Sequence, residues 1–195
     1  MFIQPMLMTE RPDPFNDNDY LFEPLIDGHR LQLTMTAGKV RLLSRHGYDV
    51  TRQYPELHNV PLRRPADVVL DGEVAFLDPL TGQADFDRLQ QRYRMTKTPR
   101  IRDAKTAMPV VYFIFDILHY NGLDVRDKPL YTRKRLLKAL LEDNAHFKQM
   151  GYVEGSGIAF YNAAKQFGLE GIAGKRKESR YSEGRSEGWV KIPAK

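Results

Sequence analysis

One stretch of this chain restricts its possible folds more than any other: PVVYFIFDILHYNG, residues 109–122. It is rich in β-branched and aromatic residues, and it is too apolar for an edge strand, so it predicts a buried strand. Asn121-Gly122 supplies a turn that ends the strand. The rest of the chain therefore has to provide strands beside this one and helices over its faces.

Four other stretches predict strands. RLQLTMTAGKVRLLSR alternates between apolar and polar residues, which predicts a hairpin with strands at 31–36 and 40–44 and a turn at Ala37-Gly38. ADVVLDGEVAFLD predicts two short strands around Asp71-Gly72-Glu73, and GIAGKRK and GWVKI predict closing strands near the end of the chain. Residues 1–20 are rich in Pro, Asp and Asn and predict an irregular lead-in.

Three stretches predict helices. ADFDRLQQRYRM carries Phe86, Leu89 and Tyr93 at helical spacing. TRKRLLKALLED predicts an amphipathic helix, and a further helix is expected from residues 157–167, ending at Gly168. The expected core side of the amphipathic helix consists of Leu136, Leu137, Leu140 and Leu141. Strands and helices in this order indicate an α+β fold of antiparallel sheets flanked by helices, and 195 residues suit a single domain.

The charge and cysteine content narrow the function. The net charge of +5 favours a polyanionic partner such as nucleic acid or a nucleotide, although it equally fits a basic protein that is merely soluble. The chain has no cysteine, which removes disulfides, thiolate nucleophiles and cysteine–zinc sites and fits a cytoplasmic location. No apolar run approaches the roughly 18 residues of a membrane span, so no membrane partner is expected.

Five stretches combine charged residues with turns inside well-formed strands. They are EPLIDGHR, SRHGYD, DGE, YFIFD, and EGIAGKR together with GWVK. Each has a purely structural explanation: Asp27-Gly28 as a hairpin turn, Glu170-Gly171 as a helix cap, Arg45 as a surface charge, and the rings as core residues. Together they supply carboxylates, fixed cations and an aromatic ring, which are the groups that a nucleotide site needs.

In order and spacing, these stretches resemble the nucleotidyltransferase (adenylation) domain of ATP-dependent DNA ligases of the small bacterial or phage type, or of the bacterial end-joining type. The resemblance covers nearly the whole chain. The family pattern Lys-x-Asp-Gly-x-Arg appears as Leu25-Ile26-Asp27-Gly28-His29-Arg30, Ser-Arg-x-Gly as Ser44-Arg45-His46-Gly47, and Asp-Gly-Glu as Asp71-Gly72-Glu73. The pattern Tyr-x-x-Phe-Asp is nearest to residues 112–116, Glu-Gly-x-x-x-Lys appears as residues 170–175, and Trp-x-Lys as residues 189–191.

The resemblance implies an ATP-grasp-like adenylation domain and a three-step reaction. A lysine attacks the α-phosphate of ATP to form lysyl-AMP, AMP moves to the 5′-phosphate of nicked double-stranded DNA, and the 3′-hydroxyl then displaces AMP. ATP and Mg²⁺ are the implied cofactors, because each displacement at phosphorus needs cations to neutralise developing charge. The implied cellular roles are DNA replication, repair and recombination.

The resemblance also implies roles for individual residues. Asp27 orients the nucleophile, Glu23 lies near the adenine edge, and either Tyr112 or Phe113 stacks on adenine. Glu73 binds the ribose, and Glu170 helps to hold the metal, with Glu73 as a second metal ligand. The phosphate contacts are assigned to Arg30, Arg45, Lys175 and Lys191, and Lys191 also serves catalysis.

Leu25 stands where the family has its nucleophilic lysine. A leucine side chain has no lone pair, so it cannot form the phosphoramidate, and self-adenylation is predicted to be lost. Three explanations are open: an engineered substitution, which we favour, a natural copy that binds without reacting, or a modified lysine recorded as leucine.

The chain departs from the family pattern in two further ways. Pro193 stands where the last motif has a lysine, which weakens the expected triphosphate contacts there. The family continues into an oligonucleotide-binding β-barrel, and this sequence ends before it, so an isolated and monomeric adenylation domain with weak, salt-sensitive DNA binding is expected. Two alternatives stay open, namely a non-catalytic nucleotide- or DNA-binding module and an RNA ligase or capping-type nucleotidyltransferase.

Overall fold

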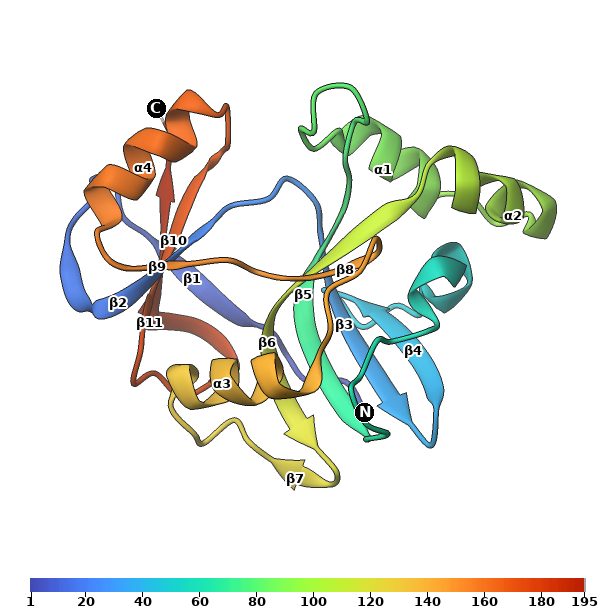
Figure 1. Cartoon of the computed structure of the whole chain (residues 1–195), viewed down its shortest axis with the longest axis horizontal. Helices are drawn as coiled ribbons and strands as arrows, with labels where there is room; N and C mark the ends of the chain where they lie inside the picture. Colours follow the sequence, from blue (N-terminus) through green and yellow to red (C-terminus); the bar gives the residue numbers. More distant parts are fainter. Residues whose placement is uncertain (195) are drawn as a thin grey trace.

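Two β-sheets lie side by side in the computed structural model, which describes residues 1–194 (Figure 1). The first sheet has five strands in the order β1-β11-β10-β2-β9. Its strands are β1 (Met6–Glu10), β2 (Asp17–Pro24), β9 (Val153–Gly155), β10 (Gly171–Arg176) and β11 (Gly184–Pro193). The second sheet has six strands in the order β4-β3-β5-β6-β7, with β8 paired to β6. Its strands are β3 (His29–Thr36), β4 (Lys39–Ser44), β5 (Val68–Phe76), β6 (Val110–Tyr120), β7 (Leu123–Asp124) and β8 (Phe147–Gln149).

Four α-helices and two short 3₁₀ turns surround the sheets. They are α1 (Phe86–Tyr93), α2 (Thr98–Ala107), α3 (Leu130–Leu140) and α4 (Gly157–Gln166), with 3₁₀ turns at Thr51–Gln53 and Pro55–Leu57. Helix α4 covers the first sheet, whereas α1 and α2 lie at the far end of the second (Figure 1). The predicted α+β fold is confirmed, and no helix within residues 1–194 is long and apolar enough to cross a membrane.

The strand predicted from residues 109–122 is confirmed as β6, in the interior of the second sheet. It pairs antiparallel with β5 and with β7, and parallel with β8. Its two faces serve different cores, because side chains alternate along a strand. Tyr112 and Ile114 pack in the core of the second sheet, while Phe115 and Leu118 pack in a second cluster with Trp189.

The predicted hairpin is also confirmed, as β3 and β4. Ala37 and Gly38 both have positive φ angles, 48° and 75°, which is the conformation of a tight two-residue hairpin turn. The register pairs Leu33 with Leu42, and both side chains are fully buried. This pairing places the end of β4 next to the start of β3.

Two strand predictions were wrong. The residues around Asp71-Gly72-Glu73 form one continuous strand, β5, and not two short ones. Gly72 permits this because a Cβ there would overlap the carbonyl oxygen of Phe113 on β6, and the register between the two strands shifts beside it. The lead-in at residues 1–20 contains β1 and the start of β2, and β1 pairs parallel with β11, so the sheets are mixed and not purely antiparallel.

The helix predictions hold with one addition. In α3 and the residue after it, Leu137, Leu140 and Leu141 are buried and Leu136 packs against the core, as predicted. The same helix also buries two cations, Arg133 and Lys134. Helix α2 was not predicted, because it buries only Ile101 and Ala104 and has little apolar periodicity.

Candidate functional site

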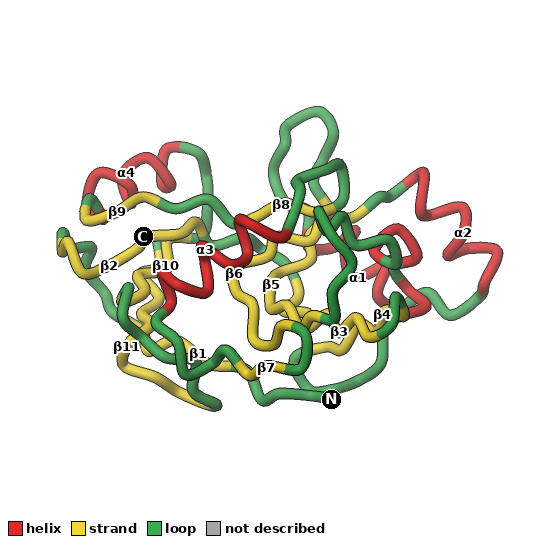
Figure 2. The backbone as a smooth tube through the Cα atoms, turned by 60° about the horizontal axis from the view of Figure 1, so that its bottom comes forward, coloured by secondary structure: helices red, strands yellow, loops and turns green. Residues whose placement is uncertain are grey.

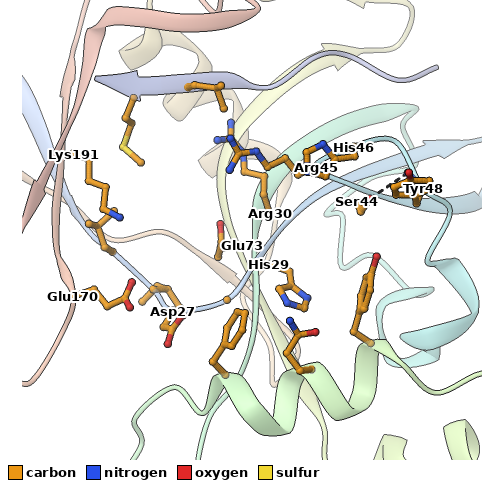
Figure 3. Close-up of a pocket in the computed structure, with 18 of the residues that line it drawn as sticks. Asp27, His29, Arg30, Ser44, Arg45, His46, Tyr48, Glu73, Glu170 and Lys191 are labelled. Carbon is orange, nitrogen blue, oxygen red and sulfur yellow. Dashed lines mark hydrogen bonds between the residues drawn. The ribbon is translucent and has the colours of Figure 1, made fainter. Parts of the chain in front are cut away.

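A cavity of about 710 Å³ opens between the two sheets (Figure 3). Its walls come from the loop between β2 and β3, the turn after β4, the exposed face of α1, and β11. Glu170 and Lys191 lie on one side of the cavity, and Arg45 and His46 lie on the other. The volume falls in the range of about 300–1,000 Å³ that is typical of small-molecule sites.

The loop between β2 and β3 places Leu25 on the border of two cavities. The backbone N–H of Leu25 donates to the carbonyl oxygen of Gly171 at 3.1 Å, which ties the loop to β10. Gly28 lets the chain enter β3, because a Cβ at this position would overlap the carbonyl oxygen of Val74. Leu25 is half-buried and lines both the large cavity and a smaller one beside it.

Three carboxylates face the large cavity, from Asp27, Glu73 and Glu170. Burial raises the pKa of Glu73 to about 8, and Arg30 opposes this shift while the charges of Asp71 and Asp27 add to it. A carboxyl group with this pKa is largely protonated at neutral pH when no cation faces it. Glu73 therefore suits either a hydrogen bond to a hydroxyl group or a cation that restores its charge.

Among residues 1–194, two of the cations that line the cavity are unpaired, as are its three carboxylates. Arg45 on the turn after β4 and Lys191 on β11 form no ion pair with any carboxylate of residues 1–194. His46 and Arg185 also line the cavity, and sequence reasoning missed both as site residues. Unpaired cations around one cavity attract phosphate groups.

Arg30 is arranged differently from the prediction. Its Nε and one terminal nitrogen donate to the carboxylate of Asp71 at 2.8 and 2.6 Å, and Asp71 also accepts a hydrogen bond from the hydroxyl of Tyr181 at 2.6 Å. Arg30 still borders both cavities, with its guanidinium 4.8 Å from the centre of the Phe115 ring. Because Asp71 neutralises most of its charge, Arg30 is a weaker candidate for a phosphate contact than Arg45 or Lys191.

The smaller cavity, of about 60 Å³, lies behind Leu25 and is lined by Glu23, Phe115, Lys175 and Trp189. The carboxylate of Glu23 accepts from Lys175 at 2.6 Å and from Lys134 on α3. Burial favours a higher pKa for Glu23, but the two ammonium groups lower it overall. Burial lowers the pKa of Lys175 to about 8. The Glu23 carboxylate opposes this shift only in part, because Lys175 shares it with Lys134.

The structure places the two rings predicted for adenine stacking away from both cavities. Tyr112 is fully buried, its hydroxyl donates to the carbonyl oxygen of Leu31 at 2.7 Å, and it lines neither cavity. Phe113 packs against a core cluster and also lines neither cavity. The rings beside the small cavity belong to Phe115 and Trp189, and the Lys175 ammonium lies 4.0 Å from the centre of each. The sequence signal for Phe115 was its position directly before Asp116, on the opposite face of the strand from Tyr112.

Helix α1 contributes a wall of the cavity that sequence reasoning did not assign to the site. Phe86, Gln90 and Tyr93 lie at helical spacing and line the large cavity, whereas Leu89 faces the core. His29 stands edge-on to Phe86 and Tyr93, with ring centres 5.1 and 5.0 Å apart. Burial lowers the pKa of His29, so its imidazole is neutral at physiological pH.

The carboxylates of the cavity suit a magnesium ion without forming a complete cage for one. Within residues 1–194, no group of three or more His, Asp or Glu side chains converges on a common point. Mg²⁺ commonly takes only one or two carboxylates and completes its shell with water and substrate phosphates. Glu73 and Glu170 offer two such oxygen donors to one cavity, and neither forms an ion pair within residues 1–194.

The pKa of Glu73 gives a first testable prediction. The pKa of Glu73 in the folded state lies above its ordinary value of 4.5. As pH rises, the unfolded chain therefore releases the carboxyl proton of Glu73 before the folded chain does. Ionisation of Glu73 thus destabilises the fold as pH rises from about 4.5 to about 8. We expect Glu73→Gln to be more stable than the parent by about 2 kcal/mol at pH 8.5, and by little at pH 4.5. Thermal unfolding across this range checks it, with the exposed Glu178→Gln as control. Parallel curves for parent and Glu73→Gln would contradict a raised pKa.

Comparison with known proteins identifies the family that this chain resembles. Residues 5–193 match the family model described as "ATP dependent DNA ligase domain". The chain is 36% identical over 193 residues to the SPbeta prophage-derived DNA ligase-like protein LigB of Bacillus subtilis, covering 98% of this chain and 67% of LigB. It is 33% identical over 180 residues to the multifunctional non-homologous end joining protein LigD of Pseudomonas aeruginosa, covering 89% of this chain and 20% of LigD.

A solved structure agrees with these sequence matches. The mycobacterial DNA ligase D complexed with ATP and MES superposes with a TM-score of 0.77 and 30% identity, covering 97% of this chain and 59% of that chain. The chain therefore spans about two thirds of LigB and a smaller share of the longer proteins.

Proposed function

The chain belongs to the family of ATP-dependent DNA ligase domains, and from this premise we propose that it binds ATP and nicked double-stranded DNA but does not adenylate itself. One observation carries the proposal: an aliphatic side chain, Leu25, lies among carboxylates and unpaired cations at the junction of the two cavities. Members of the family are enzymes, so the site is built for chemistry at phosphorus, but the residue in the nucleophile position cannot react.

The base and sugar of the nucleotide are assigned to the inner part of the site. Phe115 stacks on adenine, and Glu23 lies at the adenine edge in the small cavity. A cavity of about 60 Å³ is smaller than a purine, so the ammonium of Lys175 has to move away from the ring of Phe115 when the base enters. Glu73 binds the ribose hydroxyls, which its raised pKa favours because a protonated carboxyl group both donates and accepts hydrogen bonds.

The phosphates are assigned to the outer part of the site. Lys191 contacts the α-phosphate, Arg45 contacts a phosphate of ATP or of the nick, and Lys175 joins them once it leaves Phe115. Glu170, with Glu73 in its ionised form as a second ligand, would hold Mg²⁺, which would add positive charge beside the phosphates. Asp27, two residues after Leu25 and also on the wall of the large cavity, is assigned to orient the group that reacts.

The step that this chain retains is the last one. The DNA 3′-hydroxyl attacks the phosphorus of a pre-adenylated 5′ end, a new phosphodiester P–O bond forms, and the P–O bond to AMP breaks. The hydroxyl proton passes to solvent or to Asp27, and the displaced AMP carries the negative charge. Lys191 and Arg45 stabilise the charge that builds on the phosphate oxygens, and this step needs no covalent contribution from residue 25.

A pre-adenylated nick gives the direct test. We expect the chain to seal a 5′-adenylated nick without ATP, and not to seal a 5′-phosphorylated nick with ATP and Mg²⁺. Lys191→Ala is expected to slow sealing at least tenfold, by removing one preorganised charge at the reacting phosphate. Gel analysis of a labelled strand measures both, and the exposed Lys138→Ala on α3 serves as control.

The main alternative is a non-catalytic binding module, which Leu25 itself favours. Such a module binds ATP and nicked DNA but leaves the pre-adenylated nick unsealed, so the same assay separates the two. The RNA ligase or capping alternative is set aside, because the matching family and the relatives are DNA ligases. A cytoplasmic role in DNA repair is proposed from the end-joining relatives. The monomeric state, the adjoining barrel domain, and roles in replication and recombination stay predictions.

A further inference from the structure

The net positive charge of the chain is concentrated in one segment outside the cavity. Residues 94–105 and the neighbouring Arg52 carry six cations and one carboxylate, a net charge of +5. The six cations, here called the α2 basic surface, are Arg52, Arg94, Lys97, Arg100, Arg102 and Lys105. The whole chain also has a net charge of +5, so the remaining residues are balanced and this surface supplies the entire excess.

These cations are exposed and almost unpaired. Among residues 1–194, Arg94, Lys97, Arg100 and Lys105 form no ion pair, and the contact of Arg102 with Asp103 is long, at 3.7 Å, with both side chains more than three-quarters exposed. Arg52 donates to the carbonyl oxygen of Thr96 and to the hydroxyl of Thr98, both at 3.3 Å. Arg52 is thereby held beside the start of α2.

The fold does not need this charge. Helix α2 is anchored by buried Ile101 and Ala104 and by a hydrogen bond from Arg92 to the carbonyl oxygen of Ala104. Cations gathered on a short surface segment repel one another, and Arg100 in the first turn also opposes the positive end of the helix dipole. Such an arrangement is stabilised when a polyanion lies against it.

The α2 basic surface continues from the wall of the cavity. Gln90 and Tyr93 of α1 line the cavity, and Arg94 follows Tyr93 directly at the end of α1. Helix α2 then extends to the end of the molecule opposite α4, as Figures 1 and 2 both show. Its 10 residues span about 15 Å, which matches the length of about four base pairs of B-DNA.

We propose that the α2 basic surface binds the sugar–phosphate backbone of duplex DNA a few base pairs from the reacting phosphate. The proposal rests on the proposed function, which places the nick in the cavity. The contacts are made to phosphates, so they add affinity and orientation without reading base sequence. The surface thereby extends the protein's hold on DNA beyond the cavity.

Salt dependence of DNA binding tests this surface. Each phosphate contact contributes a slope of about −0.9 to the plot of log affinity against log salt concentration. We expect Arg100→Gln/Lys105→Gln to make the slope shallower by about 1–2 and to weaken binding of a nicked duplex several-fold at 50 mM NaCl. Fluorescence anisotropy with the intact chain measures both quantities, and Gln retains helix propensity.

A matched variant controls for the loss of two charges. Arg135→Gln/Lys138→Gln on α3 removes the same pair of residue types from exposed positions on another helix, and it is expected to leave the slope within about 0.3 of the parent. Equal shifts in both double variants, or no shift in either, overturn the α2 assignment. An equal loss of binding to a single strand of the same length overturns the assignment to duplex DNA.

Failure of this inference is distinguishable from failure of the proposed function. If the parent and both double variants seal a pre-adenylated nick and bind it with one common salt slope, only the α2 basic surface is wrong. If the parent chain leaves that nick unsealed but the slope still changes in the α2 variant alone, the surface stands and the sealing proposal is wrong.

Discussion

Leu25→Lys is expected to convert the chain from one that carries no AMP after incubation with ATP and Mg²⁺ into one that carries a single covalent AMP. Residue 25 borders both cavities, so an amine at this position lies between the proposed base site and the proposed phosphate cations. Arg30, Lys175 and Lys191 surround the same cavities, and nearby cations lower the pKa of a lysine and thereby raise the fraction of reactive free amine. The reaction also needs a fixed approach of about 3–3.5 Å, which the tether of residue 25 to Gly171 favours.

Intact-protein mass spectrometry measures this effect in the parent and in the variant. Leu25→Met is the matched control, because it conserves volume and flexibility without adding an amine. An adduct on Leu25→Lys alone supports the proposal. An adduct on the parent chain would overturn it and direct the search to another lysine. An adduct on neither would point to Pro193, to a requirement for a further domain or to a binding module.

Arg92→Leu is expected to cause a large loss of stability, because this residue anchors α1, the helix that lines the cavity. Arg92 is fully buried and donates to both carboxylate oxygens of Glu56, at 2.9 and 3.0 Å. It also donates to the carbonyl oxygens of Ala104 at 3.0 Å and Gln53 at 2.7 Å, so one guanidinium joins α1, α2 and the 3₁₀ turns. Its removal leaves the buried Glu56 charge without its partner, which costs about 3–5 kcal/mol.

Urea unfolding of the parent and the variant measures this loss. The control is Arg88→Leu on the same helix, whose guanidinium lies 3.7 Å from Asp85 and is about half exposed, and it should change stability by less than about 0.5 kcal/mol. The double variant Arg92→Leu/Glu56→Leu is expected to recover most of the loss, because it removes the stranded charge. A single variant as stable as the parent would show that this pair does not hold α1 in place.

Sequence periodicity was sufficient for the elements whose stability is local. The central position of β6 followed from its apolar and aromatic composition, and the β3–β4 hairpin followed from alternation around Ala37-Gly38. Helices α1, α3 and α4 followed from apolar spacing. These patterns depend only on neighbours within a few residues, so they can be read without a tertiary structure.

The elements that were missed depend on distant partners. Strand β1 exists because it pairs with β11 from the other end of the chain, and nothing local in residues 6–10 indicates that pairing. The two strands expected around Gly72 are one strand because β6 approaches closely enough to need a glycine. Helix α2 carries little apolar periodicity, and its place depends on the buried guanidinium of Arg92.

The site divides in the same way. The order of charged turns was enough to indicate the ligase family and to select residues of which most lie on the two cavities. Only the tertiary structure decided that Phe115 and not Tyr112 faces the small cavity, that Asp71 holds Arg30, and that Glu23 is shared by Lys134 and Lys175. The partners in these pairs lie 41 to 152 residues apart in sequence, so their contact is set by how the two sheets pack together and not by any local pattern.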